Sequence, residues 1–251
     1  MTVRTLTALP VYNEEKYLPG VLAEVLRYAE EVLVVDDGST DRTPQILDSF
    51  AGIHRVRHAA NRGYGAALRS AFRFAIRNRY DVLVTIDCDG QHEPRRIPRF
   101  IRVSRYADIV SGSRYMKPFA GDSRPPEARR RINRHVTHLL NQALGLHLTD
   151  AFCGFKAYRV AALKALRLTE DGYAMPLELW VQAAAAGLSI LEIPVPLIYL
   201  DEARSFGGAL DNAAFRLQHY YQVLERSLES VGWQERFPGK RYAAWVRGIG
   251  G

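Results

Sequence analysis

Cysteine is scarce in this 251-residue chain, which contains only Cys88 and Cys153. Two cysteines cannot form a disulfide scaffold, and no C-x-x-C spacing indicates a zinc site. Long apolar runs are also missing, because the most apolar stretch, residues 183–200, is interrupted by a glutamate and two prolines. The first residues lack the pattern of a secretory signal peptide. These absences favour a reducing, cytoplasmic setting in which any membrane contact is peripheral.

Internal repeats and low-complexity tracts are absent too, and 47% hydrophobic with 24% charged residues is typical of a folded protein. The length is compatible with one catalytic domain. We expect this domain to span residues 1–210, with residues 211–251 adding an amphipathic helix and a tail packed on it. Basic residues exceed acidic ones by 34 to 27, and the net charge of +7 favours anionic partners.

Short apolar runs alternate with helical periodicity along the first third of the chain. Strands are predicted at residues 5–11, 31–36, 53–58 and 81–87, with helices at 13–27, 40–50 and 65–77. Such alternation predicts an α/β fold, in which helices flank both faces of a mostly parallel, Rossmann-like central sheet. Later strands are predicted at 109–112 and 189–195, helices at 135–144, 176–186 and 215–231, a basic flexible loop at 114–134, and a segment that crosses back at 149–157.

Polar residues gather where three predicted strands end, at residues 10–14, 36–41 and 87–91. Ligands of parallel sheets bind beyond the carboxyl ends of the strands, so we expect a binding site there. Asp87 and Asp89 can hold a hard cation such as Mg²⁺ or Mn²⁺ together with ligand phosphates, although acidic pairs also form ordinary turns.

The sequence allows two alternative roles for Asp37, which lies at the second of these strand ends. It can accept hydrogen bonds from a uracil imide or ribose hydroxyls, or it can cap the following helix. Residues 61–65, N-R-G-Y-G, open a helix but lack both the G-x-G-x-x-G spacing and a Walker lysine. A loop close to a nucleotide and a simple turn are both compatible with them.

Five motifs occur together in the order and spacing of glycosyltransferase family 2. They are PVYNE (10–14), VDDGSTD (35–41), NRGYGAA (61–67), DCDGQHEP (87–94) and GSR (112–114). Three later motifs, DAFCGFKAY (150–158), GYAMPLEL (172–179) and RSFGG (204–208), resemble the polyprenyl-phosphate branch typified by dolichol-phosphate mannosyltransferase. The resemblance implies a GT-A fold and a metal-dependent, inverting sugar transfer from a nucleotide diphosphate donor.

Carried over residue by residue, the resemblance predicts three groups of site residues. The nucleotide-sugar site comprises Pro10, Tyr12, Glu14, Asp37 and Asp87. The divalent metal, Mg²⁺ or Mn²⁺, is placed at Asp87, Asp89 and Gln91. Arg114 and Arg204 resemble the residues that face the donor diphosphate and the acceptor phosphate, and they join Asp89 as predicted catalytic residues.

Glu178 completes the predicted catalytic set, on the helix of residues 176–186. It can orient the acceptor or act as a base, or it can be a solvated helix carboxylate. A hydroxyl acceptor needs a general base, whereas a phosphate acceptor is already anionic. No histidine at the sheet edge is clearly activated, and an arginine-rich segment lies nearby, so the sequence favours a phosphate acceptor.

We therefore expect transfer of a hexose, from a donor of the GDP-mannose or UDP-glucose type, to a polyprenyl or dolichyl phosphate. Peripheral contact at the inner membrane face is expected through the basic loop and an aromatic, basic tail that begins at Trp233. A hydroxyl acceptor in cell-wall or polysaccharide synthesis is the alternative within the family. A non-catalytic nucleotide- or nucleic-acid-binding protein is a remote alternative, because the arginines concentrate in one loop and no nucleic-acid-binding signature is present.

Overall fold

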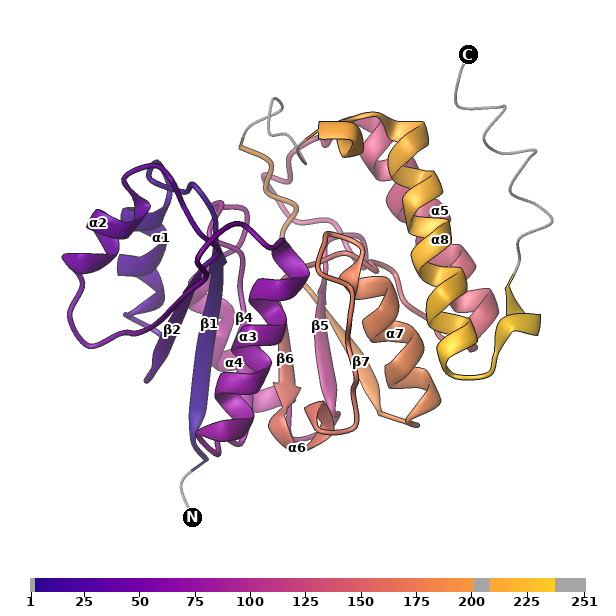
Figure 1. The fold of residues 1–251 in the computed structure, drawn as a ribbon, viewed down its shortest axis with the longest axis horizontal. Helices are drawn as coiled ribbons and strands as arrows, with labels where there is room; N and C mark the ends of the chain where they lie inside the picture. Colours follow the sequence, from indigo (N-terminus) through magenta and orange to yellow (C-terminus); the bar gives the residue numbers. More distant parts are fainter. Residues whose placement is uncertain (1–2, 201–207, 238–251) are drawn as a thin grey trace.

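The computed structural model describes residues 3–200 and 208–237, and these residues build one seven-stranded sheet in the order β3-β2-β1-β4-β6-β5-β7 (Figure 1). The strands are β1 (Thr5–Val11), β2 (Val32–Asp36), β3 (His54–Arg57), β4 (Val82–Thr85), β5 (Ile109–Ser113), β6 (Lys156–Arg159) and β7 (Ile190–Pro194). Strand β6 runs antiparallel to β4 and β5, and the other pairs are parallel. The predicted mostly parallel sheet is confirmed.

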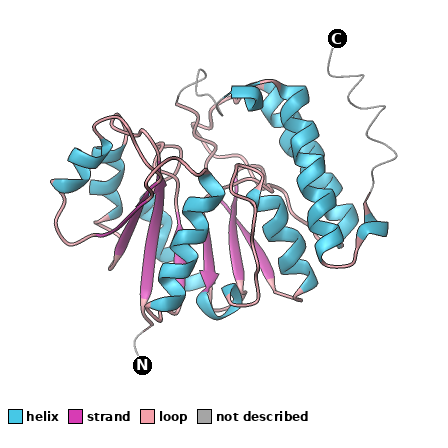
Figure 2. Cartoon of the chain, in the orientation of Figure 1, coloured by secondary structure: helices cyan, strands magenta, loops and turns pink. Residues whose placement is uncertain are grey.

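Helices cover both faces of this sheet (Figure 2). They are α1 (Leu18–Val25), α2 (Thr43–Asp48), α3 (Tyr64–Arg77), α4 (Ile97–Val103), α5 (Glu127–Leu144), α6 (Val160–Leu163), α7 (Met175–Ala185) and α8 (Ala213–Ser230). Helices α1, α2 and α4 share one apolar cluster with the sheet, and α3, α6 and α7 share the other. Helices α5 and α8 pack on α7, at the side of the molecule (Figure 1).

The two layers follow from the alternation of side chains along the central strands. In β1, Leu6 and Ala8 enter the α3 and α7 cluster, whereas Leu9 and Val11 enter the α1 cluster. A strand buried on both faces reads as a continuous apolar run, which is why the sequence revealed it clearly. Truncating such a side chain to alanine typically costs about 2–5 kcal/mol. The core therefore holds the strand ends, and the loops that follow them, in place.

The starts of two helices lie farthest from their predicted positions. The first starts only at Leu18, because Asn13 adopts a left-handed φ of 54° and its side-chain oxygen accepts a hydrogen bond from the Thr40 N–H. Residues 13–17 thus form part of the strand-end loops. Helix α5 starts at Glu127, directly after Pro126, so residues 127–134 of the predicted basic loop are helical. Proline is tolerated at a helix start, where its missing N–H has no intrahelical partner.

The last described helix, α8, packs on both α5 and α7. Trp233 and Phe237, which follow it, also pack against the same apolar cluster. The rest of the aromatic and basic tail lies outside the described residues. No helix in the part of the chain that the structure describes has the length and apolarity of a membrane span.

Candidate active site

A cavity of about 600 Å³ opens at the carboxyl edge of the sheet, between the strand-end loops and helices α5, α7 and α8. Its lining includes these predicted site residues: Pro10, Tyr12, Glu14, Asp37, Asp87, Asp89, Gln91 and Arg114. Residues from four separate motifs thus meet at one place, as the topology of a parallel sheet requires. Of the other two predicted residues, Glu178 is absent from the described lining and Arg204 lies outside the described residues.

Asp87 is held in one orientation just after β4. Its Oδ1 accepts a hydrogen bond from the Tyr64 hydroxyl at 2.9 Å, and its Oδ2 lies 3.4 Å from Nε2 of His92. Gly154 packs so closely that a Cβ there would collide with the carboxylate. Burial opposes ionisation, but the bond and charge of His92, the Tyr64 hydroxyl and the charge of Lys156 outweigh it and lower the pKa of Asp87.

Asp89 lies on the turn that follows, and its Oδ1 accepts the Gln91 N–H at 3.0 Å. Both aspartates line the cavity, and carboxylate oxygens are the ligands that Mg²⁺ and Mn²⁺ prefer. Within the described residues, no group of three histidine, cysteine, aspartate or glutamate side chains is arranged to hold a metal. The donor set therefore fits a cation that takes its remaining ligands from phosphate oxygens and water, as Mg²⁺ commonly does.

Asp37 follows β2 and is almost fully buried at the cavity wall. Its carboxylate accepts hydrogen bonds from His58 Nδ1 at 2.5 Å and from the N–H groups of Arg62 and Gly63 at 3.0 and 2.7 Å. The N-R-G-Y-G segment is thus a loop at the cavity and more than a simple turn. The reading of Asp37 as a helix cap is wrong, because its carboxylate bonds to these three groups, and the first N–H of α2, that of Thr43, donates to Asp41 instead.

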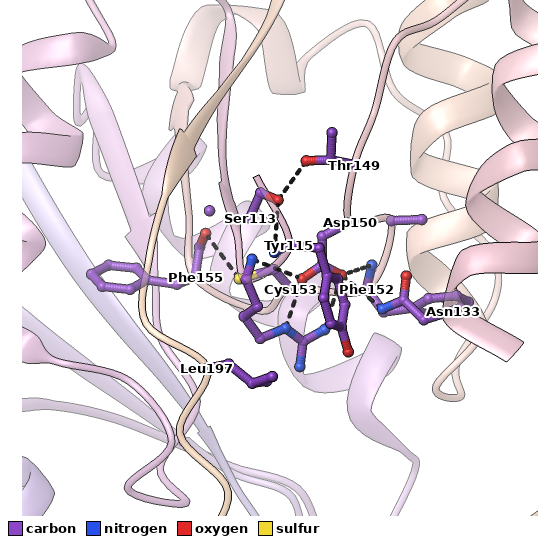
Figure 3. A network of polar contacts seen from close by, with 12 residues as sticks. Ser113, Tyr115, Asn133, Thr149, Asp150, Phe152, Cys153, Phe155 and Leu197 are labelled. Atoms are coloured by element: carbon purple, nitrogen blue, oxygen red, sulfur yellow. Dashed lines mark hydrogen bonds and ion pairs between the residues drawn. The ribbon is translucent and has the colours of Figure 1, made fainter. Parts of the chain in front are cut away.

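Arg114, which follows β5, forms a two-pronged ion pair with Asp150, which is labelled in the polar network of Figure 3. Its Nε donates to Oδ2 at 2.6 Å and its Nη2 to Oδ1 at 2.9 Å. Asn133 of α5 also donates to Oδ1, at 2.8 Å, and Glu192 of β7 accepts the backbone N–H groups of Thr149 and Asp150. The guanidinium is therefore held rigidly where it reaches the cavity.

The electrostatics of this pair follow from its burial. Burial alone would raise the pKa of Asp150, but the charge and hydrogen bonds of Arg114, with the bond from Asn133, lower it to about 2. Burial likewise opposes the charge of Arg114, yet the adjacent carboxylate outweighs it and raises the pKa of Arg114 well above its usual value. Both groups are charged at neutral pH, and the cavity carries a fixed guanidinium.

Glu178 fits neither interpretation of the sequence. It is buried on α7 and accepts hydrogen bonds from the N–H and hydroxyl groups of Thr169 and from the N–H of Glu170. It thereby holds the loop that precedes α7. This loop packs so tightly on the start of α3 that a Cβ on Gly63 or Gly65 would collide with its backbone. The structure gives Glu178 a role in shaping the cavity wall.

The model of the family Glycosyl transferase family 2 matches residues 7–167 of the chain. The chain belongs to this family. The sequence resemblance is thereby confirmed, and the protein is a glycosyltransferase. The interpretation as a non-catalytic nucleotide-binding or nucleic-acid-binding protein is set aside.

Two relatives of this glycosyltransferase match it over most of their length. The undecaprenyl-phosphate mannosyltransferase of Micrococcus luteus is 33% identical over 229 residues, which cover 87% of this chain and 94% of the relative. The polyprenol monophosphomannose synthase of Mycolicibacterium smegmatis is 31% identical over 232 residues, which cover 87% of each chain. Both relatives fall in the polyprenyl-phosphate branch that the later motifs resemble.

A solved structure supports the GT-A fold. The glucosyl-3-phosphoglycerate synthase of Mycobacterium tuberculosis, in complex with Mn²⁺, UDP and glucosyl-3-phosphoglycerate, superposes with a TM-score of 0.69. The match covers 90% of this glycosyltransferase and 80% of that chain, at 18% identity. At this identity the similarity shows a shared fold and nothing about substrates.

Sequence reasoning missed several residues of this glycosyltransferase's cavity. Arg129 lines the cavity from α5 and donates a hydrogen bond to the Tyr199 hydroxyl. The sequence instead placed Arg129 in a flexible loop. Arg216 of α8 is nearly buried and donates to the Leu210 carbonyl at 2.6 Å. Burial lowers the pKa of Arg216. An arginine within an amphipathic helix gives no sequence signal that it turns inward. Asp150 belonged to a quoted motif, but its pairing with Arg114 depends on the tertiary fold.

Proposed function

We propose that this glycosyltransferase transfers a hexose from a nucleotide diphosphate sugar to a polyprenyl phosphate, with inversion and with a divalent cation. The observation that carries the proposal is the mixed charge of one cavity. Carboxylates from the β4 loop and guanidinium groups from the β5 loop, α5 and α8 line it together. A cation-bridged diphosphate suits the carboxylates, and a second anionic substrate suits the guanidinium groups. The names of the two relatives support a mannose donor and a polyprenyl phosphate acceptor.

On the donor side, Pro10, Tyr12, Glu14 and Asp37 would surround the nucleoside. Asp87, Asp89 and Gln91 would hold the cation, which when bound neutralises the charge that builds on the departing nucleoside diphosphate. Arg114 adds a positive charge that the pairing with Asp150 keeps in place. Preorganised charges of this kind stabilise a transition state because they need no reorganisation during the reaction.

On the acceptor side, a phosphate is already ionised, so it needs orientation rather than proton removal. Arg129 and Arg216 line the cavity beside Arg114, and guanidinium groups match phosphate oxygens with two parallel hydrogen bonds. We propose that Arg204 faces the same phosphate. Glu178 is buried and engaged with backbone N–H groups, which supports an acceptor that requires no base from α7.

We propose that the enzyme meets its lipid as a peripheral protein at the cytoplasmic membrane face. Exposed residues adjoin cavity-lining ones along the chain, with Arg124 and Arg130 beside Pro125 and Arg129, Leu200 beside Tyr199, and Phe215 beside Arg216. Exposed basic and apolar side chains around a cavity mouth suit a surface of anionic lipid head groups. A lipid acceptor could then enter the cavity directly from the membrane.

The test offers radiolabelled GDP-mannose and UDP-glucose, with Mn²⁺, to undecaprenyl phosphate and to simple sugars in parallel. We expect label to pass to the lipid phosphate from one of the two donors. Arg204→Ala should weaken this transfer far more than it weakens nucleotide binding, and Arg204→Lys should not restore the full rate, because a point charge lacks the guanidinium fork. Transfer to a sugar hydroxyl, with none to the lipid, would favour the hydroxyl-acceptor alternative and overturn the proposed acceptor.

A further inference from the structure

A chain of side-chain hydrogen bonds leads from α3 to Asp37, behind the cavity wall. Arg73 Nη2 donates to the Ser70 hydroxyl at 2.9 Å, which lies 2.9 Å from His58 Nε2. His58 Nδ1 in turn lies 2.5 Å from Asp37 Oδ1. His58 and Ser70 are only 8% and 7% exposed, and neither is among the described residues that line the cavity. Among the described side-chain hydrogen bonds, the link between these two residues and the cavity lining runs through Asp37.

The partners determine the direction of these hydrogen bonds. An ionised carboxylate only accepts hydrogen bonds, so His58 Nδ1 is the donor to Asp37. Arg73 only donates, which leaves the Ser70 hydroxyl proton available for Nε2 of a neutral His58. Every donor in the chain can then point toward Asp37. The order Ser70, His58, Asp37 matches that of a nucleophilic triad, but a serine that does not line the cavity cannot attack a substrate there.

The carboxylate of Asp37 therefore has most of its hydrogen-bond acceptor positions filled. Its two oxygens offer about four acceptor positions. His58 and the Arg62 N–H share Oδ1, and the Gly63 N–H takes one position on Oδ2. One acceptor position therefore remains on Oδ2, and Asp37 lines the cavity. The two backbone donors anchor one edge of the carboxylate, and His58 adds the side-chain donor that fixes its rotation.

We infer that His58, braced by Ser70, is a positioning residue for nucleobase recognition. It fixes the Asp37 carboxylate so that the remaining lone pair of Oδ2 meets an N–H group of the donor base. This inference rests on the proposed nucleotide-sugar donor. In this role His58 does not contact the substrate. Its loss weakens binding of the nucleobase but not binding of the diphosphate.

The test compares wild-type enzyme with His58→Leu, His58→Asn and Ser70→Ala. The matched control is His54→Asn, since His54 lies on β3, which ends just before His58, but contacts Glu31. Calorimetry with Mn²⁺ measures the Kd of UDP, GDP and inorganic pyrophosphate. By analogy with the partners of metal ligands, His58→Leu should weaken the preferred nucleotide about 10- to 100-fold. It should leave pyrophosphate binding unchanged, because the diphosphate site does not involve Asp37.

His58→Asn should recover part of the lost affinity, because an asparagine N–H can stand near the position of Nδ1. Ser70→Ala should give a smaller loss, and His54→Asn none. Equal weakening of nucleotide and pyrophosphate by the His58 and Ser70 variants would overturn the inference in favour of a general structural role, and so would unchanged nucleotide binding. Should His58→Leu fail to fold, the other two variants carry the same comparison. Failure of the wild-type enzyme to bind either nucleotide would instead overturn the proposed function itself.

Discussion

Asp87 and Asp89 both test the proposed metal chemistry, and Asp87 also bonds with Tyr64 and His92 inside the fold. Asp89→Asn keeps the side-chain size and removes the charge that a cation needs. We expect this variant and Asp87→Asn to lose about 10²–10³ in transfer rate, the usual effect of removing one charge-stabilising group. Rates measured across a Mn²⁺ titration, with EDTA as the zero point, provide the check. Undiminished transfer in EDTA, or in both variants, would rule out the metal mechanism.

Asp150 supports a second prediction at the scale of single residues. Asp150→Asn leaves the buried Arg114 charge without its partner, and breaking a buried ion pair typically costs about 3–5 kcal/mol. The control is Asp48→Asn, which breaks an exposed pair with Arg55 and should cost about 0–1 kcal/mol. Urea unfolding at neutral pH measures both. Equal stability of the two variants would contradict the role given to the buried pair.

The same ion pair makes the stability of the fold depend on pH in the acid range. The folded pKa of Asp150 is about 2, below the value near 3.9 of an unfolded aspartate. The unfolded chain therefore binds the proton first as the pH falls. The stabilisation is fully present above about pH 4 and is lost progressively toward pH 2. Asp150→Asn should lack this part of the acid sensitivity.

Single residues also show what the sequence could and could not predict about the site. Asp37, Asp87 and Asp89 were found because polar residues at strand ends meet at one edge of the sheet, and Arg114 was found through the family resemblance. The partner of each is set by tertiary packing. His58 reaches Asp37 across 21 positions of sequence, and no local pattern indicates such a contact.

Helices α5 and α7 show why the start of a helix, and the face that it turns toward the core, are hard to predict from sequence. The first turns of α5 are dominated by arginines, and its apolar stripe becomes regular only from Ile132 onward, so the sequence indicated a loop. Helix α7 is buried almost all round, from Met175 to Val181. A helix without a polar face gives no periodic signal of orientation. The sequence therefore left open whether Glu178 faces the acceptor or solvent, and in the structure it bonds to Thr169 and Glu170 instead.

Helix α5 also carries a prediction about acid stability. His135 lies 2.7 Å from the Tyr221 hydroxyl of α8, and burial, with the nearby His138, lowers its pKa to about 4. An unfolded histidine titrates near 6.5, so the unfolded chain binds a proton that the folded chain excludes. Stability should therefore fall as the pH drops from about 6.5 to 4.

His135→Gln should flatten this fall in the melting temperature. The matched control is His147→Gln, which changes an exposed histidine just beyond α5 and should retain the wild-type profile. Thermal denaturation across this pH window distinguishes the two variants. A profile of His135→Gln identical to that of the wild type would show that this buried histidine does not cause the acid sensitivity.

The molecule as a whole should bind anionic membranes through the side that bears the cavity. Replacing the exposed arginines Arg130, Arg131 and Arg134 with glutamine should weaken binding to phosphatidylglycerol vesicles by about 1 kcal/mol per residue. The control makes the same charge change at the exposed arginines Arg99, Arg102 and Arg105, on and just after α4. Co-sedimentation with vesicles measures the difference. Equal losses in both triple variants would show that net charge, and no particular face, governs binding.

At this scale the alternation of strands and helices was enough to predict the α/β architecture, since each parallel unit carries its own periodic signal. The place of the crossing-back segment was not predictable. Only its last two residues, Lys156 and Ala157, belong to β6, and the pairing of β6 with both β4 and β5 depends on partners far away in the sequence.

The position of β6 has a consequence for how the enzyme is made. Strands β1 to β4 lie side by side and can associate as soon as they leave the ribosome. Strand β5 pairs only with β6 and β7 in the described sheet, and β6 is synthesised about 40 residues after β5 ends. At about 5–20 residues per second, β5 waits several seconds without a neighbour, and nascent chains with unpaired edges are prone to aggregate. Slow translation between residues 113 and 156 should therefore lower the yield of active enzyme, because both members of the Arg114–Asp150 ion pair are synthesised within that interval, before β6 is available to pair with β5.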